Sequence, residues 1–445
     1  RKKDDAGSSA PTAASSPAPE SEDQQGPESV LLANLSSRPR LSISRHPVFV
    51  PISEGSPYHH TDQLAHNRLG FRYVPAGVAP PTFRTIESKP TGYRVSWEDR
   101  SASIKVTTDG LGLLGEKGFR GARCNAPVRE GKWYMEVVLE KGGGDRAEGE
   151  HAQGQGAHVR LGWARREAPL NAPCGLDAYS YALRDKTGEK VTLSRPRPYG
   201  PPVRSGDVVG LYISLPPLRK PNPKDPTDPA HLHRERIAIE FKGQEYFEAL
   251  EYPQTKEMSA LMDFKTKAES AAPVPPPGAK KGATMKNVSE RARENDSSSS
   301  SAADLRPLPT LEGSQIAFFI NGATPGPAFR DIYDFLPLQQ SASARHKPEK
   351  RKREREGVRG HHENSFDDGT LGYYPFISLF GCAQVRLNPG PDFAFPPPPD
   401  IDAALAEGPN TEQDPDAPRT WRPLYERYKE YMDEQWALDE TEQEE

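Results

Sequence analysis

A tight turn between apolar residues is the feature that most constrains the fold of this chain. Asn321-Gly322 follows the run Gln315–Ile320 and precedes a second bend at Gly326. Asn-Gly is the strongest two-residue hairpin signal, because both central residues of a type I′ turn need a positive φ. The run before it is rich in β-branched and aromatic residues, which favour strands. The segment therefore predicts an antiparallel β-hairpin.

More short strand-like runs occur along the chain. Most are bounded by Gly, Pro, Asn or Asp, and no helical periodicity separates them before the C-terminus. Such a succession predicts an all-β fold, an antiparallel β-sandwich. The runs predicted as strands are Ile104–Thr107, Lys132–Glu140, His158–Ala164, Tyr179–Leu183, Asp207–Leu215, Arg236–Phe241, Gln315–Ile320 and Phe376–Leu387.

The composition predicts that part of the chain is disordered. Only 34% of the 445 residues are hydrophobic, and 47 are proline. A core spread evenly over this length would be thin. We expect a disordered segment at 1–43 and disordered insertions at about 142–157, 265–309 and 339–368. The sandwich domain is then 44–399, and 400–445 holds an acidic linker and a helix.

The helix is predicted at Trp421–Leu438, where aromatic and aliphatic side chains share one face and charged side chains the other. Thr420 is the expected N-cap, and Pro423 fits a first turn. Because 400–418 resembles a linker, we expect the helix to be detached and to bind a groove on another protein. The alternative is that it docks on its own sandwich. Gln435 interrupts the apolar face and is a candidate register or specificity residue.

The sequence lacks the patterns that are typical of several function classes. The three cysteines are odd in number and far apart, which favours a reducing compartment without a disulfide framework. No apolar run is long enough to span a bilayer, so no membrane partner is expected. No metal-ligand spacing, phosphate loop or nucleophile elbow is present. The chain is therefore not expected to be an enzyme or to hold a metal or cofactor.

Six segments together carry a family resemblance. They are Gly115–Phe119, Lys132–Glu136, Val159–Ala164, Gly206–Gly210, Phe318–Gly322 and Tyr374–Leu379. In this order and spacing they resemble a SPRY domain over roughly residues 95–397. The run Arg160–Trp163, followed by residues 172–181 and Arg184, is most similar to the SPRY subunit of COMPASS-type histone methyltransferase complexes. This is the Ash-two-like or fungal Bre-two subunit, which also carries a C-terminal helix.

The resemblance implies a nuclear, non-catalytic scaffold. Such subunits hold a WD-repeat subunit, Swd-one or retinoblastoma-binding-protein-five-like, and recruit the helical dimer Dpy-thirty, called Sdc-one in fungi. They raise the activity of a SET-domain methyltransferase subunit towards lysine four of histone three. The alternative is a generic SPRY substrate-recognition adaptor of a ubiquitin ligase, which would require RING cysteines or a cullin-box helix.

The resemblance also places two binding sites. The family binds an acidic segment of its WD-repeat partner at positions that correspond here to Phe119, Arg160, Pro173, Leu176 and Arg184. An arginine fork suits a carboxylate. Tyrosine is common in the family where this chain has Phe119 and Leu176, so the site is expected to be more apolar. The alternative is two solvated arginines beside core residues. The residues expected to bind the helical dimer are Leu424, Tyr425, Tyr428, Met432 and Trp436.

A basic run provides a further candidate. Lys350, Arg351, Lys352 and Arg353 are typical of a nuclear localisation signal or of a contact to nucleosomal DNA. The alternative is a solvated disordered loop, since Glu349 and Glu354 dilute the charge.

Overall fold

The computed structural model describes residues 49–61, 72–75, 89–146, 156–241, 244–262, 305–339, 364–407, 414 and 417–444, with only the backbone path for 72–75, 236–241, 244–248, 407 and 443. These residues belong to one compact unit, Arg40–Glu445. The predicted disordered segment 1–43 and most of the three predicted insertions lie outside this part. So do Lys350, Arg351, Lys352 and Arg353.

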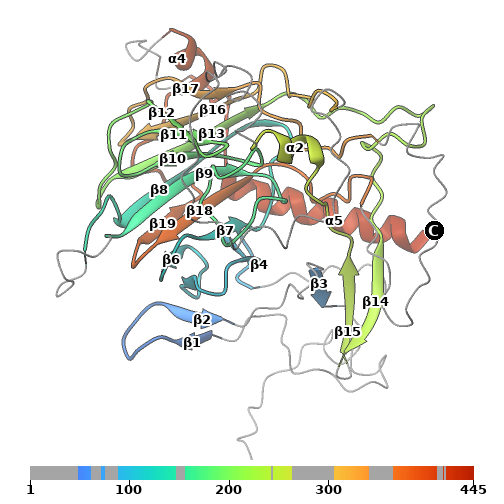
Figure 1. Cartoon of the computed structure of the whole chain (residues 1–445), viewed down its shortest axis with the longest axis horizontal. Helices are drawn as coiled ribbons and strands as arrows, with labels where there is room; N and C mark the ends of the chain where they lie inside the picture. Colours follow the sequence, from blue (N-terminus) through green and yellow to red (C-terminus); the bar gives the residue numbers. More distant parts are fainter. Residues whose placement is uncertain are drawn as a thin grey trace, which may run out of the picture. The chain divides into compact units, whose positions relative to one another are not determined.

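Two large sheets form the sandwich, and all their pairings are antiparallel except that of β20 with β8 (Figure 1). The ten-stranded sheet has the order β1-β2-β5-β6-β19-β8-β13-β16-β17, with β20 on β8. Its strands are β1 (Phe49–Pro51), β2 (His59–Thr61), β5 (Lys105–Val106), β6 (Gly112–Leu114), β19 (Gln384–Asn388), β8 (Gly131–Lys141), β13 (Val208–Leu215), β16 (Gln315–Ile320), β17 (Pro327–Arg330) and β20 (Arg422–Pro423).

The seven-stranded sheet has the order β12-β11-β10-β9-β18-β7-β4. Its strands are β12 (Arg195–Arg197), β11 (Lys190–Thr192), β10 (Ser180–Arg184), β9 (His158–Ala164), β18 (Tyr374–Phe380), β7 (Arg120–Cys124) and β4 (Val95–Arg100). A separate three-stranded sheet has the order β14-β15-β3. It consists of β14 (Arg236–Phe241), β15 (Gln244–Ala249) and β3 (Arg72–Pro75).

The main core lies between the two large sheets. Every second residue of a strand faces it, as in Val137 and Leu139 of β8 and Val159, Leu161 and Trp163 of β9. This period of two is the pattern expected when one sheet face is buried. The predicted antiparallel sandwich is therefore confirmed.

The Asn-Gly hairpin is also confirmed. Asn321 and Gly322 have φ values of 49° and 82°. Ile320 and Ala323 exchange both backbone hydrogen bonds, at 2.7 and 3.0 Å. Asn321 does more than turn the chain, since its Oδ1 accepts a 2.9 Å hydrogen bond from the Val208 amide and so ties the turn to β13.

One predicted strand was wrong. The run Phe376–Leu387 is two strands, β18 and β19, and they lie in different sheets. The chain turns between them at Gly381, which has a φ of 62°. A lone glycine inside an apolar run is a weak turn signal, so the sequence pattern did not reveal the change of sheet.

The segment predicted as a linker is partly structured. Residues 401–407 form α4 (Ile401–Glu407), and Ile401 and Leu405 are buried against Tyr134 and Phe319 of the ten-stranded sheet. Asp402 pairs with Lys132 at 2.7 Å. This helix therefore covers the sheet face that points away from the main core.

The C-terminal helix is present, but it begins later than predicted. Trp421 is not helical: the chain is extended in β20, forms the 3₁₀ turn η3 (Leu424–Glu426) and then enters α5 (Arg427–Glu444). Leu424, Tyr428 and Met432 belong to the main core. The first half of the helix is thus docked on the sandwich rather than detached. No described helix is long and apolar enough to cross a membrane.

Candidate functional site

Two arginines lie opposite each other on the outer face of the seven-stranded sheet. Arg160 of β9 faces Arg184 of β10 on one side and Ser378 of β18 on the other. Residues opposite each other in register share a face. The neighbours of Arg160 along β9, Val159 and Leu161, point into the core. Arg160 and Arg184 are therefore outward-facing, and both are half-buried.

Arg160 has no direct ion-pair partner among the described residues, although Asp185 and Glu189 act on its charge from farther away. No carboxylate of the described residues forms an ion pair with it, whereas Arg184 pairs with Glu189 at 3.3 Å. The Arg160 Nη1 donates only to the Cys174 carbonyl, at 3.3 Å, and its buried Nε has no hydrogen-bond partner. Burial, and after it the charge of Arg184, lowers the pKa of the Arg160 guanidinium. An anion placed between the two arginines would relieve both effects.

Aromatic side chains pack beside Arg160. The Arg160 Cζ lies 5.2 Å from the centroid of the Phe119 ring, within cation–π range. The Phe119 ring in turn lies 5.1 Å from that of Phe380. Phe119 is half-buried, between β6 and β7, so it is a surface wall of the site rather than a core residue.

Pro173 and Leu176 come from the segment that joins β9 to β10. Ser378 Oγ anchors this segment by accepting a 2.8 Å hydrogen bond from the Cys174 amide. Gly175 then turns the chain with a φ of 81°, and a Cβ there would lie 2.6 Å from the Val191 carbonyl oxygen. Because Arg160 donates to the Cys174 carbonyl, the segment that carries Pro173 and Leu176 passes beside this arginine. The five predicted residues are called the arginine row: Phe119, Arg160, Pro173, Leu176 and Arg184.

Comparison with known proteins identifies the family. A model of the SPRY domain matches residues 132–216. The Set1 complex component ash2 of Schizosaccharomyces pombe is 36% identical over 402 residues, which are 89% of this chain and 49% of that protein. The COMPASS component cclA of Colletotrichum higginsianum is 33% identical over 91% of this chain and 71% of its own length. This chain belongs to the ash2/cclA family of COMPASS components.

The predicted resemblance is thereby confirmed. The chain spans about half the length of its Schizosaccharomyces pombe relative. The COMPASS component BRE2 of Saccharomyces cerevisiae is 31% identical over 36% of this chain and 38% of its own length. The names of these ash2/cclA relatives describe components of Set1 or COMPASS complexes, which supports a subunit role.

Three side chains that the sequence did not single out support the arginine row of this ash2/cclA chain. They are Ser378, which anchors the loop, Phe380, which backs Phe119, and Glu189, which pairs with Arg184. Ser378 and Phe380 are placed by the pairing of β18 with β9, whereas Glu189 lies in the turn that follows β10. A single sequence shows which residues alternate along one strand but not which strands are neighbours.

The residues predicted to bind the helical dimer differ in exposure along the C-terminal helix of the ash2/cclA chain. Leu424 is fully buried, and Tyr428 and Met432 are buried with it in the core. Tyr425 and Trp436 are the exposed members, at 42% and 38%. In the docked helix, three of the five residues cover the sandwich, and two are left exposed to a partner.

The second half of the helix is held by polar contacts. Gln435 is buried, and its Nε2 donates a 3.2 Å hydrogen bond to the Gly369 carbonyl. Arg234 pairs with Asp439 and Glu442, one and two turns further along α5. Gln435 therefore orients the helix on its own sandwich. In the described part of the chain, no group of metal-ligating side chains is present.

Proposed function

We propose that this chain is a non-catalytic scaffold and activating subunit of a COMPASS complex that methylates lysine four of histone three in the nucleus. Its arginine row would bind an acidic segment of the WD-repeat subunit. The observation that carries the proposal is the placement of Arg160 directly opposite Arg184 on the outer face of the seven-stranded sheet, with no ion pair from a carboxylate to Arg160 among the described residues.

The chemistry of the row favours an acidic segment. Two like charges opposite each other on a sheet repel. A carboxylate would neutralise this repulsion and accept charge-assisted hydrogen bonds from the guanidinium forks. Phe119, Pro173 and Leu176 supply apolar contacts on either side, which would hold the aliphatic part of the segment. The carboxylate would fix the orientation, and the apolar wall would add affinity.

A second surface is proposed for the Dpy-thirty-like helical dimer. Tyr425 lies in the 3₁₀ turn η3, and Trp436 lies in α5. Both are exposed, whereas Leu424, Tyr428 and Met432 are buried in the sandwich. The two exposed side chains are called the outer stripe of the helix, and the three buried ones the inner stripe. Exposed aromatic side chains on a rigid helix are typical anchors for a partner groove. The docked helix would thus present the outer stripe without first having to fold.

Activation of the SET-domain subunit would be positional. A scaffold that holds the WD-repeat subunit and the enzyme together reduces the ordering cost at the active site. No residue of this chain then needs to touch the methyl group, consistent with relatives that are named as complex components.

Reconstitution tests this function directly. The purified chain should transfer no methyl group from S-adenosylmethionine to a histone-three peptide. A complex of the other subunits should gain activity, by about tenfold or more, when the chain is added. Turnover by the chain alone, or full activity without it, would refute the scaffold assignment.

A further inference from the structure

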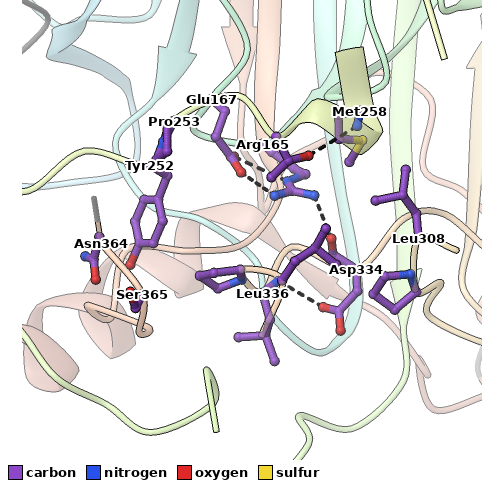
Figure 2. A pocket seen from close by; sticks show the side chains of 14 residues that line it. Arg165, Glu167, Tyr252, Pro253, Met258, Leu308, Asp334, Leu336, Asn364 and Ser365 are labelled. Carbon is purple, nitrogen blue, oxygen red and sulfur yellow. Dashed lines mark hydrogen bonds and ion pairs between the residues drawn. The ribbon is translucent and has the colours of Figure 1, made fainter. Parts of the chain in front are cut away.

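A cavity of about 100 Å³ lies away from the arginine row (Figure 2). It opens between the segment after β9, the helix α2 (Lys256–Ala260) and residues 308–338. Its walls are largely apolar and include Met258, Leu308 and Leu336. A space of this size holds several water molecules or one long side chain.

The polar groups of the cavity carry one uncompensated charge. Arg165 is paired with Glu167, with its Nε 3.3 Å from Oε2, and its Nη1 donates to the backbone carbonyl of Asp334 at 2.6 Å. Figure 2 shows these contacts around the central guanidinium. Arg219, the other cation that acts on Asp334, is held by Asp228 at 2.6 Å. Each of these two arginines is therefore paired with another carboxylate, and among the described residues the Asp334 carboxylate forms no ion pair with either of them.

Asp334 is a poorly compensated carboxylate. One oxygen accepts a 3.0 Å hydrogen bond from the Leu336 amide, and no described residue forms an ion pair with the group. Burial raises its pKa, with partial relief from the Leu336 amide and from Arg165. A half-buried carboxylate that lines a cavity is stabilised by an arriving cation.

We propose that this cavity binds a lysine or arginine side chain of a basic partner peptide. The methylene groups would lie against Met258, Leu308 and Leu336, and the charged end would reach Asp334, the arrangement that amphipathic basic side chains prefer. An acidic side chain would meet Asp334 and Glu167. A neutral aliphatic side chain would cover the carboxylate without pairing it, which is costly. The site thus has the opposite charge preference to the arginine row and shares no residue with it.

Fluorescence anisotropy with two matched peptides tests the proposal. The probe is fluorescein-labelled Gly-Ala-Ala-Lys-Ala-Ala-Gly, and the control peptide carries norleucine, which keeps the aliphatic stem without the charge. We expect the lysine peptide to bind the full chain at least about tenfold more tightly, as one charge-assisted hydrogen bond implies. Asp334→Asn should remove that preference. Asp331→Asn is the matched control, since Asp331 is exposed, does not line the cavity and tolerates asparagine at its φ of 49°.

Three results would overturn the proposal. The first is equal binding of the lysine and norleucine peptides, a comparison that does not depend on any variant folding. The second is an unchanged preference for lysine in Asp334→Asn whose thermal midpoint matches that of the wild type. The third is binding that occurs only after residues 340–363 are removed, because the chain's own basic run would then be the competing occupant.

Discussion

At the scale of single residues, Gly162 decides whether the arginine row can form. It lies two positions after Arg160 in β9, and a Cβ at this position would lie 1.8 Å from the Tyr181 carbonyl oxygen of β10. No side chain fits there unless the two strands separate. The close pairing that sets Arg160 opposite Arg184 therefore depends on this glycine.

Gly162→Ala should lower the free energy of unfolding by about 3 kcal/mol, the upper range for inserting a methyl group into a packed site. Urea unfolding of the purified chain measures the loss. Gly206→Ala is the control, since its φ of 91° is strained for alanine but the space around it is open. That change should cost about 1–2 kcal/mol. Equal losses for the two variants would contradict the steric role of Gly162.

A second residue, Asp367, predicts a dependence of stability on pH. Burial raises the pKa of its carboxyl from 3.8 to about 6, although Arg129 and the Gly369 amide oppose the shift. The folded state therefore binds more protons than the unfolded state between these values. Stability from this group should fall as the pH rises from about 4 to about 6.

Asp367→Asn should remove that fall. The difference in free energy of unfolding between the wild type and the variant should change by about 2 kcal/mol between pH 4 and pH 6, since one pKa unit corresponds to about 1.4 kcal/mol and titration is incomplete at both ends of this range. Urea titrations at pH 4, 5 and 6 measure it. Parallel pH profiles for the two proteins would show that Asp367 does not titrate in this range.

At the scale of elements, turn chemistry was more predictive than periodicity. Asn321-Gly322 fixed its hairpin because the turn needs two positive φ values. The run Phe376–Leu387 looked like one strand because Gly381 was its only turn signal. The helix was placed too early because Trp421 fits the apolar face and Pro423 fits a first turn, yet Arg422 and Pro423 form β20 and pair with β8 instead.

The docked helix predicts separate roles for its two stripes. Tyr425→Ala combined with Trp436→Ala should leave stability within about 1 kcal/mol, because both side chains are exposed. The same pair should weaken capture of the helical dimer by about 2 kcal/mol or more. Calorimetric titration and urea unfolding measure the two effects.

The control for this pair is Leu424→Ala, which should cost about 2–5 kcal/mol of stability because Leu424 is fully buried. Full retention of dimer capture by the Tyr425 and Trp436 variant would show that the partner uses the other stripe. The helix would then have to leave the sandwich to bind.

At the scale of the whole molecule, the sequence predicted the sandwich class but not which strands pair with one another. The period of two along β8 and β9 was visible in the residues themselves. The strand pairing that places Ser378 beside Arg160 was not, because β9 and β18 are far apart in the chain. The buried helix α4 was missed because its seven residues lie in an acidic, proline-containing stretch.

The arginine row is where the outer face of the seven-stranded sheet, the β9–β10 segment and a partner would meet, so the proposed function depends most on its charge. Arg160→Glu with Arg184→Glu should weaken binding of the purified WD-repeat subunit at least about a hundredfold. The thermal midpoint should change little, because both side chains lie on the outer face. The control, Lys186→Glu with Arg204→Glu, makes the same change of charge at exposed positions outside the row.

Isothermal titration calorimetry of the WD-repeat subunit into these two variants and the wild type is the most direct measurement. We expect wild-type affinity for the Lys186 and Arg204 variant and a large loss of affinity for the Arg160 and Arg184 variant. Unchanged affinity in the Arg160 and Arg184 variant, with its fold intact, would show that the arginine row does not bind the WD-repeat subunit.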